Sequence, residues 1–131
     1  MSTPYKLSAT LTAHSADVRA LCAPTPDLVI SGSRDTTAIA WRRTGAADSK
    51  IWDPATVFRA SGGYIGSVTY INPTPDAPQG YAVVGGQDAV INVYNIATGS
   101  SEPERTLLGH TGNVCALNTS TEGTIISGSW D

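Results

Sequence analysis

The chain has 131 residues, of which 40% are hydrophobic and 15% charged, and its formal net charge is −3. This length suits one domain with a single core. The acidic balance and the scatter of only eight Lys and Arg residues argue against binding to nucleic acid. No apolar run is long enough to span a membrane, and MSTPYKLSAT does not resemble a secretory signal. We therefore expect a cytoplasmic and nuclear protein that binds neither nucleic acid nor membrane.

Three related copies follow one another along the chain. They begin with LTAHSADVRAL (11–21), SGGYIGSV (61–68) and LGHTGNVCAL (108–117), and they continue as VISGSRDTTAIAW (29–41), VVGGQDAVINVY (83–94) and IISGSWD (125–131). The copies succeed one another at a spacing close to the roughly 40–45 residues of a propeller blade. A repeat of this length fixes the architecture of a protein more firmly than any single motif does.

The distance from His to Asp is the same in the first and third copies, where His14 precedes Asp35 and His110 precedes Asp131. In the second copy Asp88 lies further from the aligned residue, Ser61, and the extra residues fall in the Pro-rich stretch NPTPDAPQG. We predict that this stretch, residues 72–80, is a loop insertion.

Within each copy the apolar residues alternate with polar ones or form short runs that end in Gly, Asp or Asn. This pattern predicts short antiparallel strands and no amphipathic helix. The Asp in RDTT and in QDAV is expected in tight turns, where its side chain bonds nearby backbone. A small sheet of this kind cannot cover its own apolar faces, so its stability must come from stacking against neighbouring sheets.

Gly109–His110, Asp35 and Trp41 resemble the blade signature of the WD-repeat family. The resemblance implies an all-β propeller in which buried side chains form a hydrogen-bonded tetrad. In the first copy these would be His14, Ser31, Asp35 and Trp41. The second copy departs from the signature at Ser61 and Tyr94, and we expect no complete tetrad there. The third copy supplies His110, Ser127 and Asp131, and its Trp would lie beyond the end of the sequence.

A closer resemblance rests on YKLSATLTAHSADVRAL, LLGHTGNVCAL and ISGSWD, which are similar to the phospholipase A-2-activating protein family. It implies an N-terminal propeller that binds ubiquitin in ubiquitin homeostasis and ubiquitin-dependent degradation. The family also docks on a hexameric AAA ATPase segregase, through domains outside this chain. We expect no cofactor.

The expected fold is an incomplete WD-repeat β-propeller, with about two and a half blades of an expected seven-blade ring. We expect 1-12 to be the outer strand of the closing blade, 13-58 to be blade one, 59-107 to be blade two and 108-131 to be the start of blade three. Such a chain would expose strand edges and apolar blade faces, so we expect it to fold poorly alone or to self-associate.

Ubiquitin would bind the rim around the propeller axis, as partners of WD-repeat propellers do. The rim positions are Asp17, Arg19 and Arg34 in blade one, Tyr64, Gly66 and Gln87 in blade two, and Asn113, Cys115 and Trp130 in blade three. Asp17 is the first candidate because a rim carboxylate suits a basic partner. Trp130 is the second, because large aromatic side chains are enriched at binding hot spots.

A hydrolase is a third hypothesis, since His14, Ser31 and Asp35 are the residue types of a hydrolase triad. However, the sequence lacks a G-x-S-x-G elbow, and SGGYIGS has no Lys for a phosphate loop. The two His residues are too distant in sequence to suggest a metal site. Cys22 and Cys115 are expected to be buried and unpaired. We predict a ubiquitin-binding module, with a WD-repeat scaffold for another protein as the alternative.

Overall fold

A computed structural model of the chain describes residues 5–45, 49–59 and 62–131. These residues form ten strands and one short 3₁₀ turn, η1 (Ile96–Thr98). The all-β class predicted from the alternating pattern is therefore confirmed. Among the described residues, no helix has the length and apolar character needed to cross a bilayer.

The strands form three antiparallel sheets that follow chain order. The first sheet contains β1 (Val18–Thr25), β2 (Leu28–Ser33), β3 (Ala38–Thr44) and β4 (Ile51–Phe58). The second contains β5 (Ile65–Ile71), β6 (Tyr81–Gly86), β7 (Ile91–Asn95) and β8 (Arg105–Leu107), and the third contains β9 (Val114–Thr119) and β10 (Ile125–Ser129). Hairpins join neighbouring strands throughout, as the regular turn signals indicate.

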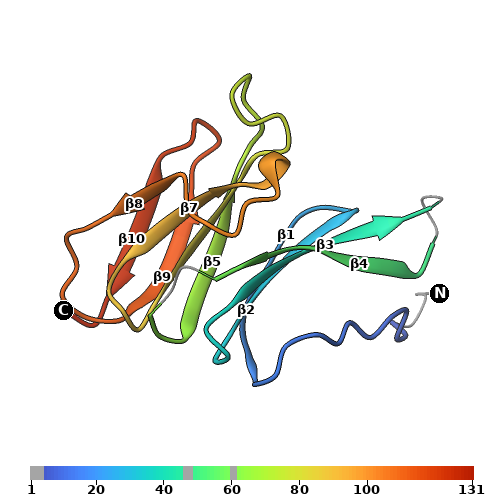
Figure 1. Cartoon of the computed structure of the whole chain (residues 1–131), viewed down its shortest axis with the longest axis horizontal. Coiled ribbons are helices and arrows are strands. Elements are labelled where there is room, and N and C mark those ends of the chain that lie inside the picture. The colour runs from blue at the N-terminus through green and yellow to red at the C-terminus, as the bar shows by residue number, and fades with distance from the viewer. Residues whose placement is uncertain (1–4, 46–48, 60–61) are drawn as a thin grey trace.

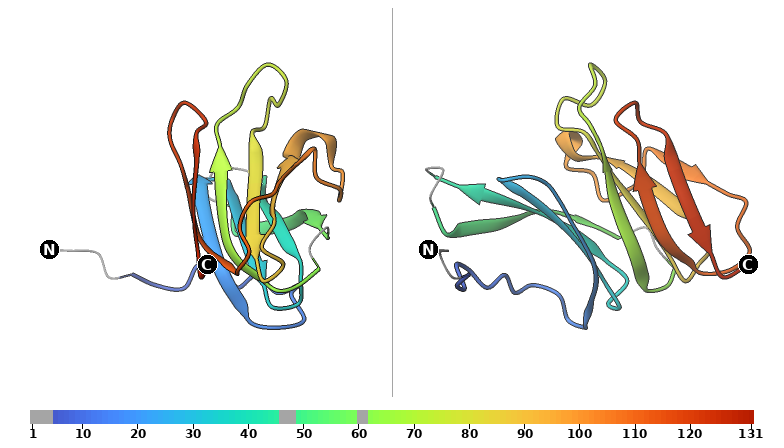
Figure 2. Two further views of the ribbon diagram at one scale, coloured as in Figure 1. Left: turned by 90° about the vertical axis from the view of Figure 1, so that its left-hand side faces the viewer. Right: turned by 180° about the vertical axis from the view of Figure 1, so that it is seen from behind.

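The first strand of each sheet lies on a common inner side of the molecule. Strand β5 contacts both β1 and β9, so the second sheet stands between the other two (Figure 1). The views from the side and from behind show the same fan of sheets (Figure 2). The arrangement places the loops that precede β1, β5 and β9 at one end of these strands.

The turns after β2 and β6 depend on an Asp side chain. Asp35 Oδ1 accepts a hydrogen bond from Thr37 N at 2.9 Å, and Asp88 Oδ1 accepts one from Val90 N at 3.2 Å. The residues that follow each Asp, Thr36 and Ala89, have φ values of 75° and 65°. Non-glycine residues seldom adopt this left-handed conformation. The two Asp carboxylates therefore stabilise a left-handed backbone conformation that Thr and Ala residues disfavour.

Apolar residues pack between successive sheets. The core between the first and second sheets includes Ile30, Phe58 and Tyr94, and the rings of Phe58 and Tyr94 are 4.4 Å apart at their centroids. A smaller core between the second and third sheets is built around Val83 and Val114. The sheets are thus stabilised by their neighbours, as expected for units that cannot cover their own faces.

A glycine permits the close approach of each sheet to the next. A Cβ atom at Gly32 in β2 would lie 2.4 Å from Ile65 Cγ2, and one at Gly85 in β6 would lie 2.7 Å from Val114 Cγ1. Ile65 and Val114 are the first residues of β5 and β9. The same contact therefore recurs at both junctions between sheets.

The Pro-rich stretch 72–80 connects β5 to β6 as an extended loop, in which Thr74 and Ala77 pair as an isolated bridge. Its main chain is tied to the second sheet, because Asn95 Nδ2 donates to Asp76 O at 3.1 Å. The loop projects from the end of the strands opposite to Tyr64, at the top of Figure 1.

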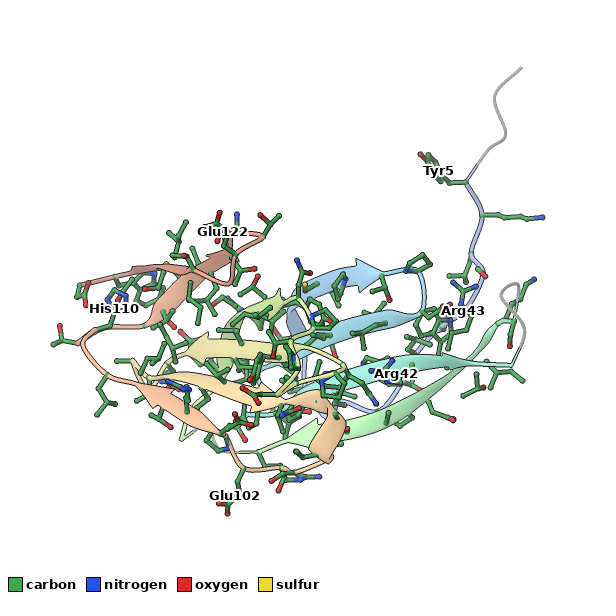
Figure 3. The ribbon with its side chains drawn as sticks, turned by 90° about the horizontal axis from the view of Figure 1, so that it is seen from above. Tyr5, Arg42, Arg43, Glu102, His110 and Glu122 are labelled. Carbon is green, nitrogen blue, oxygen red and sulfur yellow. The ribbon has the colours of Figure 1, made fainter. Side chains whose placement is uncertain are left out.

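The N-terminal residues 5–12 form no strand in the described chain. Tyr5 is fully exposed and lies well clear of the sheets (Figure 3). The assignment of this segment to the outer strand of a closing blade stays a prediction.

The expectation that both cysteines are buried is wrong for Cys115, which is exposed on β9. Cys115 lies on a strand that alternates between a face packed on the second sheet, represented by buried Val114, and an open face. Cys22 is partly buried, and burial raises the pKa of its thiol.

Candidate functional site

Four side chains from the first sheet, its β2–β3 turn and the loop before β1 form one chain of hydrogen bonds. Trp41 Nε1 donates to Ser31 Oγ at 2.9 Å, and Ser31 Oγ lies 2.7 Å from His14 Nε2. His14 Nδ1 lies 2.8 Å from Asp35 Oδ2. The geometry fits a neutral imidazole that accepts from Ser31 and donates to the carboxylate. The structure thus brings together the four residues predicted for this copy.

Two further residues, not singled out from the sequence, complete the surroundings of Asp35. Thr37 Oγ1 donates to Asp35 Oδ1 at 2.6 Å, and Ser15 N donates to Asp35 Oδ2 at 3.0 Å. Burial by itself raises the pKa of Asp35, but the hydrogen bonds from Thr37, His14 and Ser15 together lower the pKa far below its usual range. The carboxylate is therefore ionised at neutral pH and joins the loop before β1 to the turn after β2.

The third sheet repeats the histidine part of this arrangement. His110 Nδ1 lies 2.9 Å from Asp131 Oδ2, and His110 Nε2 lies 2.8 Å from Ser127 Oγ. Hydrogen bonds from Thr111 N and from His110 lower the pKa of Asp131. The equal separation of His and Asp in the two copies therefore corresponds to the same local geometry.

Among the described residues, the second sheet repeats the turn carboxylate of this arrangement. Asp88 Oδ2 accepts from Gly62 N at 3.1 Å, while Val84 occupies the position of Ser31 and offers no hydroxyl group. Ser61 lies outside the described residues, and Tyr94 at the Trp position is buried. Val84, four residues before Asp88 as Ser31 is before Asp35, is a further departure from the signature that is visible in the sequence.

The rim candidates are joined in pairs by one recurring backbone hydrogen bond. In each sheet, the amide of the residue before the turn Asp donates to the carbonyl of the residue directly before the first strand, which is β1, β5 or β9. The three bonds are Arg34 N to Asp17 O, Gln87 N to Tyr64 O and Trp130 N to Asn113 O, each 3.0 Å long. The structure therefore gathers six predicted rim residues at the same end of three adjacent sheets.

Ser33 makes further hydrogen bonds at the rim of the first sheet, between the residues before β1 and the turn after β2. Its Oγ lies 2.9 Å from Asp17 O and 3.2 Å from Ala16 O, and it accepts a hydrogen bond from Asp35 N at 3.0 Å. In the third sheet Ser129 likewise accepts from Asp131 N, at 3.2 Å. The second serine of the repeated Ser-Gly-Ser string, which was not predicted to have a role, makes this hydrogen bond in both sheets.

Asp17 is exposed at the rim, but its carboxylate is already paired. Arg19 Nη1 lies 3.6 Å from Asp17 Oδ2, and Arg34 Nε lies 3.5 Å from Asp17 Oδ1. The guanidinium group of Arg19 also lies over the ring of Tyr64, 5.8 Å from its centroid. Asp17 was predicted to face a basic partner, and in the structure its carboxylate lies between two cations of this chain.

The other rim candidates differ in how far a partner can reach them. Trp130 is 73% exposed, and Gln87 is also exposed. Asn113 is only 8% exposed, and its side-chain oxygen has no hydrogen-bond partner among the described residues. Gly66 contributes only backbone, with Asn113 Oδ1 3.6 Å from where a Cβ would lie. The accessible rim therefore consists mainly of charged and aromatic side chains.

This arrangement suits protein recognition. Arg, Tyr and Trp are the residue types that most often dominate binding energy at protein interfaces. They stand here on strands, in tight turns or directly beside strand ends, which position side chains more precisely than long loops do. Among the described residues, no group of three or more His, Cys, Asp or Glu side chains could hold a metal ion.

The family model described as "WD domain, G-beta repeat" matches residues 5–42 and 101–131 of this chain. Protein DOA1 of Saccharomyces cerevisiae is 40% identical over 128 residues, which are 97% of this chain and 16% of that protein. Ubiquitin homeostasis protein lub1 of Schizosaccharomyces pombe is 33% identical over 98% of this chain and 17% of its own length. The chain thus spans about a sixth of the length of these relatives.

A solved structure shows the same fold. The crystal structure of the WD40 β-propeller domain of Doa1 superposes on this chain with a TM-score of 0.79 and 36% sequence identity. The match covers 98% of this chain and 40% of the solved chain.

Proposed function

Since the chain belongs to the WD40-repeat family and is homologous to Doa1, Lub1 and the phospholipase A-2-activating proteins, we propose that it is a protein-interaction module whose rim binds ubiquitin. The propeller fold and the family resemblance predicted from the sequence are both confirmed. Ubiquitin binding by these residues is our proposal.

The observation that carries the proposal is the recurring rim. Three sheets present side chains at the same end of the fold, each placed by the same backbone hydrogen bond. Arg19, Arg34 and Trp130 supply exposed groups suited to a protein surface. The name of one relative, a ubiquitin homeostasis protein, supports ubiquitin as the partner.

The hydrogen-bonded tetrad fits a binding protein better than it fits a hydrolase. Ser31 is 3% exposed, and its hydroxyl oxygen already accepts the Trp41 indole N–H while lying beside His14. A nucleophile must reach its substrate, and this oxygen is covered and engaged. The tetrad is therefore a structural tie between a loop and a turn.

We further propose that this module contributes to ubiquitin homeostasis and ubiquitin-dependent degradation as part of an adaptor. Docking on an AAA ATPase segregase, which the family resemblance implies, would use residues outside this chain. The rim described above supplies the ubiquitin contact alone.

The test is an NMR titration of isotope-labelled ubiquitin with the chain, comparing wild type with Asp17→Arg. We expect the chemical-shift changes on ubiquitin to be lost or weakened at least about tenfold in the variant, the size of a hot-spot loss. Asp17 is exposed, so the variant should keep the fold, which circular dichroism can check.

Asp76→Arg is the matched control, because it makes the same charge reversal in the exposed loop between β5 and β6, at the far end of the strands. It should leave binding unchanged. An equal loss of affinity in both variants would show a general effect of charge and would contradict a binding site at the rim. If the folded wild type gave no shifts, the chain would be a WD40 scaffold for another protein.

A further inference from the structure

The rim of the first sheet contains a small charged cluster of Asp17, Arg19 and Arg34. Each carboxylate oxygen of Asp17 faces a different arginine, at 3.6 Å for Arg19 and 3.5 Å for Arg34. The three side chains are between 41% and 58% exposed. The cluster is thus accessible to a partner, and its charges sum to one excess positive charge in a chain of net charge −3.

The backbone fixes where this cluster stands. Arg34 N and Ser33 Oγ both bond to Asp17 O, so the carboxylate starts from a position that is set relative to Arg34. Arg19 is held by a second contact, because its guanidinium lies over the ring of Tyr64 from the next sheet. A cation above an aromatic face gains an attraction that an isolated surface ion pair lacks.

A basic group on the partner would gain little from Asp17 in this setting. The basic group would have to displace Arg19 or Arg34 from the carboxylate. It would thereby replace one weak, exposed ion pair with another. Each guanidinium, by contrast, carries five N–H donors in a rigid fork. Asp17 lies near Nη1 of Arg19 and Nε of Arg34, so the other N–H donors of both arginines can bond acceptors on an approaching surface.

We propose that Asp17 is a positioning residue, and that Arg19 and Arg34 are the groups that contact the partner. The complementary surface then presents hydrogen-bond acceptors, either carboxylates or main-chain carbonyls. This inference rests on the proposed function, since it describes how the same rim holds ubiquitin. It reverses the expectation that the rim carboxylate itself meets a basic partner.

A double-mutant cycle tests the inference with the labelled-ubiquitin titration. The four proteins are wild type, Asp17→Asn, the double variant Arg19→Gln with Arg34→Gln, and the triple variant. We expect the double variant to lose about tenfold in affinity or more. Asp17→Asn should weaken binding in the wild-type background and have almost no effect when both arginines are absent, because it acts only through them.

Equal effects of Asp17→Asn in the two backgrounds would overturn the inference, because an additive loss means that the carboxylate touches ubiquitin directly. Unchanged affinity of the double-arginine variant would overturn it as well. Arg105→Gln, which removes an exposed charge from β8, is the matched control and should bind as wild type does. Absence of binding by wild type itself would instead refute the proposed function, and the inference with it.

Discussion

The carboxylate of Asp35 shows how one residue can define both a turn and a loop. It accepts hydrogen bonds from the loop before β1, through Ser15 and His14, and from the turn after β2, through Thr37. Its side chain is 9% exposed. Hydrogen bonds to a charged group stabilise a fold by about 1.5–3 kcal/mol, so this residue should matter for stability in its ionised state.

We expect Asp35→Asn to lower the free energy of unfolding by about 1–3 kcal/mol at pH 7. Because folding lowers the pKa of Asp35, its contribution is present above the unfolded value of about 4 and is lost as pH falls towards the folded value. The difference between variant and wild type should therefore shrink below about pH 4. Urea unfolding of the chain between pH 7 and pH 2.5 would measure it.

Asp76→Asn is the control for this pH series, since Asp76 is an exposed loop residue. It should follow the wild type at every pH. A difference between Asp35→Asn and wild type that stayed the same at pH 7 and at pH 2.5 would contradict the role assigned to the ionised carboxylate.

The tetrad was predictable because the sequence resembles the WD-repeat family, whose blades carry it. Three of its members lie in the hairpin of β2 and β3, and His14 lies in the loop before β1. The separation of His14 and Asp35 in sequence is 21 residues, and the same separation of His110 and Asp131 gave the same geometry. The pairing of Asp17 with two arginines was not predictable in this way. Surface side chains of this length have many rotamers, and one of the two arginines is held by the ring of Tyr64 from another sheet.

At the scale of elements, the second strand of each sheet carries a glycine at the same point. In β2 this residue is Gly32, which packs against Ile65, the first residue of β5. In β6 it is Gly85, which packs against Val114, the first residue of β9. In β10 the equivalent Gly128 has only Ala116 nearby, with 3.5 Å from a built Cβ to Ala116 Cβ. The three glycines therefore share a position but differ in what lies against them.

We expect Gly85→Ala to lower the free energy of unfolding by about 1–3 kcal/mol, the usual effect of overpacking a tight core. The new methyl group would lie 2.7 Å from Val114 Cγ1, and the stiff valine cannot turn away because its Cβ is also at 3.0 Å. Gly128→Ala should change stability by less than about 0.5 kcal/mol. Chemical unfolding of both variants tests this, and equal losses would contradict the proposed packing.

Strand patterning predicted the β elements because the apolar alternation is local to each strand. The packing at Gly32 was hidden, since its neighbour Ile65 belongs to the following copy and only the fold brings them together. Residues 5–12 show the opposite case. Their alternation indicates a strand, but a strand needs a partner edge, and these residues pair with none in the described chain.

At the scale of the whole molecule, two apolar faces lie open at opposite ends of the row of sheets. Leu21 on β1 is 69% exposed, and Ile126 on β10 is 61% exposed. Inner faces of the same kind are buried where two sheets meet. Exposed apolar faces of this type promote association between molecules.

We therefore expect the chain to associate as its concentration rises, and the double variant Leu21→Lys with Ile126→Lys to shift the population towards monomer. Sedimentation velocity over a range of concentrations would measure this. Ile51→Lys is the control, because Ile51 is exposed on the outer strand β4 and not on either end face. Monomeric wild-type protein at all concentrations would contradict the expectation.

The recurring backbone hydrogen bond at the rim also has an evolutionary consequence. Peptide groups place the residues at positions 34, 87 and 130, and every residue except proline carries the required N–H. Side chains at these positions can therefore be exchanged while the framework stays the same. Substitutions that change the binding partner can therefore leave the free energy of unfolding almost unchanged. The binding specificity of this rim can therefore change one position at a time, without a prior gain in stability.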